Sequence, residues 1–146
     1  MVSSDNVGGG VPKLNGEMLS LDWLQLSGFK SFADKTLIRF DQGINGIIGP
    51  NGCGKSNLAD ALGWVLGAGS ALSLRSEKMD DVIFAGTRKR RPSSVVEAIL
   101  SFSRTDGGAI SLKETEFSGD TLEISRKLYR SGESIYSVNQ RRCRLK

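Results

Sequence analysis

Alternating apolar and polar residues predict a series of β-strands along most of the chain. Alternate positions are apolar from Leu19 to Leu26, with an interruption at Leu24, and Thr36–Phe40 has a similar pattern. A period of two is the pattern of a strand with one buried face. Three later segments have the same character and are separated by turn sequences such as TDGG and SGES: Ser94–Phe102, Thr121–Arg130 and Ser134–Asn139.

A short apolar run and a helical pattern lie among these strands. Ile44–Ile48 is mostly apolar and bounded by glycine, as expected of a buried central strand. A helix is predicted after the loop that follows this run, because apolar residues at helical spacing would form one buried face: Leu58, Ala61, Leu62, Val65 and Leu66. Gly67 and Gly69 are expected to end this helix. The fold class is therefore α/β, with a strand, a loop and a helix flanked by antiparallel hairpins.

The loop between this strand and helix, GPNGCGKS, matches the phosphate-binding pattern GxxxxGK[ST]. A chance match in a chain of this length has a probability on the order of 1%. Glycines let backbone N–H groups point into one concavity, where they and the positive end of the helix hold phosphate oxygens. Lys55 is expected to reach the β and γ phosphates of ATP, and Ser56 to ligate Mg²⁺. The predicted nucleotide-binding residues of the loop are Gly49, Pro50, Asn51, Gly52, Cys53, Gly54, Lys55, Ser56 and Asn57.

The second half of an ATPase site is not evident in the sequence. Hydrolysis also needs a carboxylate at the end of an apolar strand, which holds Mg²⁺ and polarises water. In KMDDVIF, Asp80 and Asp81 precede the apolar residues instead of following them. A chain with the phosphate loop alone is expected to bind nucleotide weakly or to hydrolyse it slowly, unless another segment completes the site. The alternative is a glycine-rich turn that merely joins a strand to a helix.

Length and composition narrow the possible functions. The 146 residues suffice for one domain, which we place at residues 19–146 after a flexible leader at residues 1–18. The chain has no histidine, and its two cysteines, Cys53 and Cys143, do not have the spacing of a disulfide framework or of a zinc site. A zinc site and a His-based catalytic triad are therefore excluded. The sequence shows neither a membrane span nor a signal peptide, so we expect a cytoplasmic protein. Its net charge of +4 is concentrated toward the C-terminus, where an anionic polymer is a candidate partner.

Five blocks of the sequence, taken in order, resemble one known family. They are LSGFKSFADKT (26–36), GPNGCGKSN (49–57), WVLG (64–67), SLRSEKMDDVIFAGT (73–87) and LYRSGESIYSVNQRRCRLK (128–146). Together they resemble the N-terminal lobe of the ATPase head of bacterial SMC proteins, the structural maintenance of chromosomes family. The resemblance implies a P-loop NTPase fold of the ABC type, in a head assembled from the two ends of one polypeptide that a coiled coil joins.

The resemblance assigns further residues to the nucleotide site. Lys30 of GFKSF matches a basic residue near the nucleotide phosphates, and Arg75 of SLRS matches an arginine that approaches nucleotide when two heads engage. Lys55 and Arg75 are thus the expected catalytic residues. The chain departs from the family pattern LRGGK, because Ser76 and Glu77 replace the two glycines. Arg75 is therefore expected to be held differently from its family counterparts.

The resemblance also implies a DNA-binding surface. Lys78, Arg144 and Lys146 match basic positions on the upper surface of the head, where the engaged dimer holds duplex DNA. Alternating basic residues on a strand project from one face and suit the DNA backbone. Such contacts are independent of base sequence. The basic loop Thr87–Pro92 matches no family role and is expected to be an exposed loop, with auxiliary phosphate contact as the alternative.

The function that the resemblance implies is that of an SMC ATPase in chromosome condensation and segregation, associated with the nucleoid in the cytoplasm. Expected partners are the C-terminal lobe of the same polypeptide, a second head that joins on ATP binding, a kleisin subunit and duplex DNA, with no membrane. The signature motif, the glutamine loop and the Walker B carboxylates are absent from the sequence. The chain alone is therefore expected to be catalytically inactive.

Three alternatives to this function remain open from the sequence. The first is a related ABC-type head in DNA repair or recombination, which would depend on DNA ends or on a nuclease partner. The second is a small-molecule kinase with the same phosphate loop, which would need a substrate pocket and its own acidic strand. The third is a DNA-binding module whose loop is vestigial.

Overall fold

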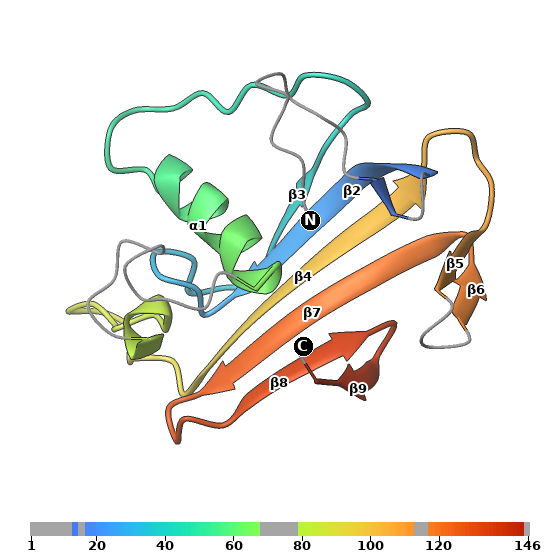
Figure 1. The fold of residues 1–146 in the computed structure, drawn as a ribbon. Coiled ribbons are helices and arrows are strands. Elements are labelled where there is room, and N and C mark those ends of the chain that lie inside the picture. The colour runs from blue at the N-terminus through green and yellow to red at the C-terminus, as the bar shows by residue number, and fades with distance from the viewer. Residues whose placement is uncertain (1–12, 15–16, 68–78, 113–116, 145–146) are drawn as a thin grey trace, which may run out of the picture.

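A computed structural model of the chain describes residues 13–14, 17–67, 79–112 and 117–144. In these residues a long, twisted antiparallel sheet carries one α-helix on one of its faces (Figure 1). The sheet has the strand order β1-β2-β4-β7-β8-β9, and β3 pairs with β2. Its strands are β1 (Lys13–Leu14), β2 (Glu17–Ser27), β3 (Thr36–Arg39), β4 (Val95–Arg104), β7 (Thr121–Tyr129), β8 (Ser134–Val138) and β9 (Arg141–Cys143).

Three further elements complete the described structure. The helix α1 spans Lys55–Val65, and a short 3-10 helix, η2, spans Met79–Val82. A separate hairpin pairs β5 (Ile110–Leu112) with β6 (Phe117–Gly119). The five strands predicted from alternation and the predicted helix are confirmed, whereas β1, β5, β6 and η2 were not predicted. The basic residues near the C-terminus were expected to alternate on a strand, and β9 includes Arg142 but ends before Arg144.

The core lies between α1 and the sheet. Every second residue of β4 from Val96 to Phe102 is buried, as the period of two requires. Trp64 and Phe29 are both completely buried, and their ring centroids lie 5.6 Å apart. These two aromatic rings therefore belong to the core.

One residue of the predicted buried helix face lies elsewhere. Leu66 is 59% exposed, because α1 ends at Val65 and Leu66 is already the C-cap. Gly67, which follows with a φ of 99°, donates its N–H to Trp64 O and ends the helix as predicted. Gly69 lies outside the described residues.

The predicted central strand at Ile44–Ile48 is wrong. This segment has no regular secondary structure, and Ile44 and Ile48 have relative exposures of 103% and 98%. A strand exists only when its N–H and C=O groups pair with a neighbouring strand. No strand in the described part of the chain lies beside this segment, so its apolar side chains remain in water.

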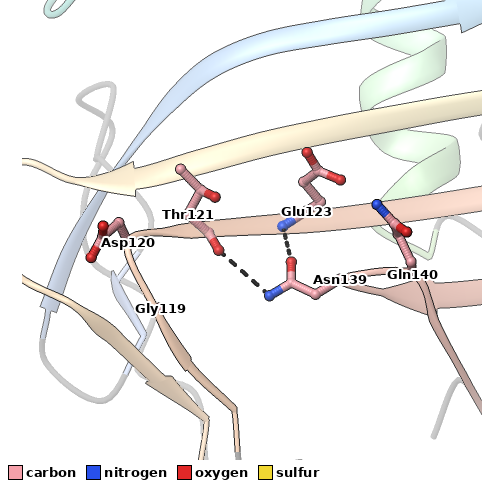
Figure 2. A pocket seen from close by; sticks show the side chains of 6 residues that line it. All are labelled: Gly119, Asp120, Thr121, Glu123, Asn139 and Gln140. Carbon is pink, nitrogen blue, oxygen red and sulfur yellow. Dashed lines mark hydrogen bonds between the residues drawn. The ribbon is translucent and has the colours of Figure 1, made fainter.

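The turn between β8 and β9 is a two-residue hairpin turn formed by Asn139 and Gln140. Both have positive φ, 46° and 66°, as a type I′ turn requires. The Asn139 amide reaches back to β7, where its Oδ1 accepts the Glu123 N–H at 2.6 Å (Figure 2). Figure 2 also shows the shallow pocket of about 320 Å³ beside this turn, which Asp120 and Glu123 help to line. These carboxylates make it unsuitable for phosphate.

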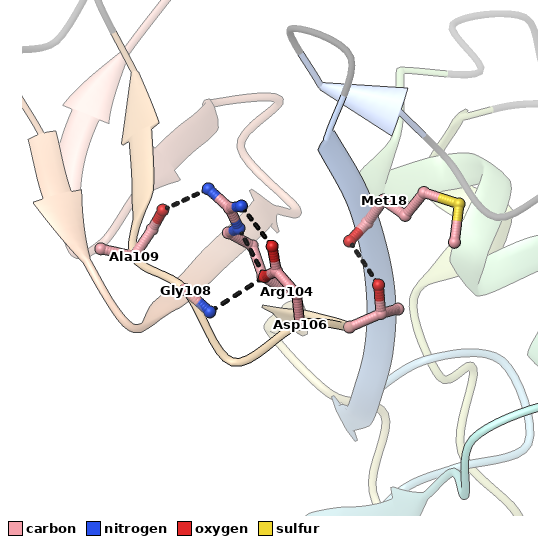
Figure 3. A network of polar contacts seen from close by, with 6 residues as sticks. Met18, Arg104, Asp106, Gly108 and Ala109 are labelled. Carbon is pink, nitrogen blue, oxygen red and sulfur yellow. Dashed lines mark hydrogen bonds and ion pairs between the residues drawn. The ribbon is translucent and has the colours of Figure 1, made fainter.

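A polar network closes the turn that follows β4 (Figure 3). The Arg104 guanidinium and the Gly108 N–H both donate to the Asp106 carboxylate, at 2.8 and 2.9 Å. Thr105 donates its N–H to Met18 O at 3.1 Å, which attaches the turn to β2. Hydrogen bonds from Arg104 and then from Gly108 lower the pKa of Asp106 from 3.8 to about 2.

We expect Gln140→Gly to stabilise the protein by about 1 kcal/mol, because glycine adopts positive φ without the steric cost that a Cβ imposes. The free energy of unfolding in urea measures this gain. Gln140→Ala is the control, since it removes the side chain and keeps the strain. An equal gain in both variants would contradict the explanation.

The Asp106 carboxyl should titrate with a midpoint near pH 2 in the folded protein. Because its folded pKa is depressed, its ionised form stabilises the turn above the unfolded value, and this contribution is lost as pH falls through about 2. Carbon-detected NMR of the carboxyl group measures the midpoint. Arg104→Gln should raise the midpoint toward 3.8, and an unchanged midpoint would show that the guanidinium is not the main cause.

Candidate nucleotide-binding site

The predicted phosphate-binding loop, residues 49–54, runs directly into α1. Gly54 is the N-cap residue with a φ of 95°, and no side chain caps the helix. The first turn contains no acidic residue, so the positive end of the helix is not neutralised there. Asn57 donates its N–H to Gly54 O at 2.9 Å, which closes the first turn. The arrangement leaves the start of α1 available to an anion.

Two glycines of the loop are required by its geometry. Gly54 combines its positive φ with a close neighbour, because an added Cβ would lie 2.8 Å from Ser31 Oγ. At Gly49 a Cβ would lie 2.8 Å from Cys53 Sγ. Gly52 has a φ of 82° with nothing within 4 Å, so only its backbone conformation favours glycine. The loop is therefore tightly folded at its two ends and open in its middle.

Lys55 already points its ammonium group into the loop. Its Nζ donates to the carbonyl oxygens of Gly49 and, at 2.6 Å, of Pro50. The same Nζ lies 3.9 Å from Cys53 Sγ. The residues from Gly49 to Cys53 are exposed, and Ser56 beside Lys55 is exposed as well. A phosphate that enters the loop would therefore meet the ammonium group without any rearrangement of the helix.

The segment after β2 fastens the loop and α1 to the sheet. Asn57 Nδ2 donates to Ser31 Oγ at 2.8 Å, and Lys30 Nζ lies 2.7 Å from Asp60 Oδ2 on α1. The Lys30 and Asp60 side chains are 13% and 7% exposed, so this ion pair is largely buried. Lys30 has the unusual φ of 44°, and its N–H donates to Val82 O at 2.7 Å. Lys30 is thus brought beside α1, where it is paired with a carboxylate.

The structure does not bring together every residue predicted for the site. Arg75, Lys78 and Lys146 lie outside the described residues. Arg144 is exposed and follows the end of β9. Within the described ranges, no group of three His, Cys, Asp or Glu side chains could hold a metal ion. In the same part of the chain, no helix is both long and apolar enough to cross a membrane.

Arg126 is a buried cation that the sequence analysis missed. Its side chain is in the core at 5% exposure, and its guanidinium carbon lies 4.7 Å from the ring centroids of both Trp64 and Tyr136. Its Nη1 donates to Trp64 O at 2.9 Å. Burial lowers the pKa of Arg126. The signal was present in the sequence, because Arg126 occupies an inward position of the alternating strand between Leu122 and Leu128.

Comparison with known proteins gives one consistent family. The family described as RecF/RecN/SMC N terminal domain matches residues 20–146. The chromosome partition protein Smc of Halobacteriovorax marinus is 48% identical over 128 residues, which are 88% of this chain and 10% of that protein. The chain therefore spans about a tenth of the length of the curated relatives it matches.

Solved structures agree with this assignment. The Smc head domain of Pyrococcus furiosus, bound to the C-terminal domain of ScpA, matches with a TM-score of 0.77 at 37% identity, over 87% of this chain and 31% of that one. A structure described for ATP-driven dimerisation and DNA-stimulated activation of SMC ATPases matches with a TM-score of 0.75 at 35% identity, over 85% and 72%. A RecF structure with ATP, at 19% identity and a TM-score of 0.63, shares the fold.

The family match covers the loop, α1 and the sheet except β1 and the start of β2, and the SMC heads are much closer in sequence than RecF. The resemblance seen in the sequence is thus confirmed, and so is the fold class of a P-loop ATPase head. The chain belongs to the RecF/RecN/SMC N-terminal domain family, on its SMC branch.

Proposed function

We propose that this chain is the ATP-binding lobe of an SMC-type head that acts in chromosome partition. The observation that carries the proposal is the loop itself, where glycine-dependent geometry, an uncapped helix start and an inward Lys55 ammonium meet at one exposed place. The residues fit a nucleotide phosphate, because Gly54 has a positive φ at the start of α1 and a Cβ at Gly49 or Gly54 would lie 2.8 Å from a neighbouring side chain. The named relatives are chromosome partition proteins.

In the proposed site, each residue acts through simple electrostatics. The loop amides and the start of α1 hold the phosphates, and Lys55 neutralises the charge on the β and γ groups. Ser56 is proposed to ligate Mg²⁺, which would supply positive charge that stabilises the transferred phosphoryl group. Arg75 acts across a dimer of heads. The described residues supply no carboxylate set for hydrolysis, so the chain alone is proposed to be inactive.

The rest of the site is proposed to come from the C-terminal lobe of the same polypeptide. The exposed segment Ile44–Ile48 supports this, because its apolar side chains and unpaired backbone suit a neighbouring strand. A second head and a kleisin are the other proposed protein partners. A solved Smc head binds the C-terminal domain of ScpA, and an SMC ATPase structure is described for ATP-driven dimerisation.

Duplex DNA is the proposed ligand of the basic C-terminal surface. Arg141 and Arg142 on β9 are exposed together with Arg144, and Lys78 and Lys146 are proposed to join them. Such residues contact the phosphate backbone. The logarithm of the binding constant should therefore fall with the logarithm of the salt concentration, with a slope of about −0.9 for each phosphate contacted. We place the protein in the cytoplasm on the nucleoid, where such DNA is found.

The alternatives have less support. A repair-type head of the RecF kind is disfavoured, because RecF matches at about half the identity of the SMC heads. A small-molecule kinase would need an acidic strand and a substrate pocket beside the loop, and the pocket shown in Figure 2 lies at the β8–β9 turn instead. A vestigial loop is disfavoured by the packing that preserves its glycines.

ATP turnover by the chain alone should be undetectable, and turnover should appear on addition of the C-terminal head segment from the same gene or from the Halobacteriovorax marinus relative. Duplex DNA should raise this turnover, and Lys55→Ala should lower it at least a hundredfold, because the phosphate charge loses its main partner. A coupled phosphate-release assay measures both. Substantial turnover by the chain alone, also lost with Lys55→Ala, would show a complete site and overturn the split-head proposal.

Lys30→Met should destabilise the protein by about 3 kcal/mol, because it leaves the Asp60 carboxylate buried without its ion pair. The double variant Lys30→Met/Asp60→Leu should recover most of this loss. Urea unfolding measures both values. The matched control is Arg90→Gln, which breaks the exposed Arg90–Asp34 pair, also 2.7 Å long, and should cost less than about 1 kcal/mol.

The folded double variant also tests the phosphate role of Lys30. If Lys30 contacts phosphate, the double variant should bind ATP at least fivefold more weakly than the wild type in calorimetry. An unchanged ATP affinity would assign Lys30 a structural role and exclude a phosphate contact.

A further inference from the structure

Arg126 is a buried charge without a carboxylate partner in the described part of the chain. Its guanidinium makes one hydrogen bond, to Trp64 O, and its Nε–H is buried without an acceptor. Burial of a cation is costly unless nearby groups compensate it. The compensation here comes from two aromatic faces and from the carbonyl end of α1, where the helix dipole is negative. The position of Arg126 is therefore set by Trp64 and Tyr136.

The two aromatic partners belong to different parts of the proposed machinery. Trp64 lies in the last turn of α1, the helix that begins at the phosphate-binding loop. Tyr136 lies on β8, directly opposite Cys143 of β9. The neighbours of Cys143 are Arg142 and Arg144, which are exposed on the surface proposed for DNA. One guanidinium thus touches both the helix of the nucleotide loop and the hairpin that carries the basic residues.

The order of the strands brings the β8–β9 hairpin and α1 into contact with the same side chain, Arg126. Arg126 pairs with Tyr136 in the register of β7 and β8, and both side chains point toward the face that α1 covers. A movement of the β8–β9 hairpin would shift the Tyr136 ring, because Tyr136 lies on β8. A movement of α1 would shift the Trp64 ring and the carbonyl oxygen that accepts from Arg126. The planar guanidinium between them contacts both rings, and no hydrogen bond of its Nε–H opposes a change in its orientation.

We propose that Arg126 is a coupling residue, through which ATP at the loop and duplex DNA at the β8–β9 hairpin change each other's affinity. This inference rests on the proposed function, since it assumes both ligands. Arg126 touches neither of them and acts as a positioning residue. Coupling between two binding sites is reciprocal, so the factor by which ATP changes DNA affinity equals the factor by which DNA changes ATP affinity.

The test uses the head reconstituted with its C-terminal segment. Fluorescence anisotropy measures the dissociation constant for a labelled duplex, with and without a saturating non-hydrolysable ATP analogue, at one salt concentration. The ratio of the two constants is the coupling factor. We expect a factor of at least five in the wild type and a factor within twofold of one in Arg126→Lys, which keeps the charge and loses the plane that stacks on both rings.

Two further variants keep the test decisive. Lys127→Met is the matched control, because Lys127 lies next to Arg126 on β7, points to the opposite face and pairs with Glu97 at 3.0 Å. It should keep the wild-type factor. Tyr136→Leu removes the second ring while Arg126 remains, and it decides the question if circular dichroism shows that Arg126→Lys does not fold. We expect Tyr136→Leu to lose the coupling as well.

The outcomes separate this inference from the proposed function. If the wild type binds neither ATP nor DNA, the proposed function fails and the coupling role fails with it. If the wild type binds both with a factor near one, or if folded Arg126→Lys and Tyr136→Leu both keep the wild-type factor, the coupling role is overturned while the proposed function stands. Equal loss in Lys127→Met would also overturn it, because the effect would not be specific to the stacked guanidinium.

Discussion

The packing of α1 against β4 and β7 is the contact that positions everything else in this molecule. A glycine-rich loop has too little side-chain surface to pack against the rest of the protein. Its position is therefore determined by the helix that follows it. Trp64, Ala61 and Val65 bury that helix against the inner face of the sheet. The loss of apolar surface from water is the driving force. The start of α1 is thereby presented at one end of the sheet with its backbone amides open.

Polar and charged groups attach the helix at three points along its length. In its first turn Asn57 donates to Ser31, and at its middle Asp60 pairs with Lys30 from the segment after β2. At its end, Arg126 stacks between Trp64 and Tyr136. Buried charges of this kind determine the position of the helix more than they add to the net stability of the fold, because the cost of their desolvation offsets much of their attraction. The helix that carries the nucleotide loop therefore has fixed contacts to β2 and to β7–β8.

The Ile44–Ile48 segment has the sequence of a buried strand, but the described residues provide no strand for it to pair with. Its isoleucines suit a buried strand, yet they are exposed and unpaired here. Local pattern can specify that a segment is apolar, but pairing requires a partner with matching register. The C-terminal lobe of the same polypeptide is the proposed source of such a partner strand.

The sequence alone determined the strands with alternating residues, the helix and the family, because each depends on local periodicity or on contiguous motifs. Tertiary structure alone decided three matters. It left Ile44–Ile48 unpaired, it placed Lys30 against Asp60, and it gathered Arg126, Trp64 and Tyr136 from three separate elements. These outcomes depend on which distant segments meet across the sheet, and spacing along a chain does not encode which segments meet.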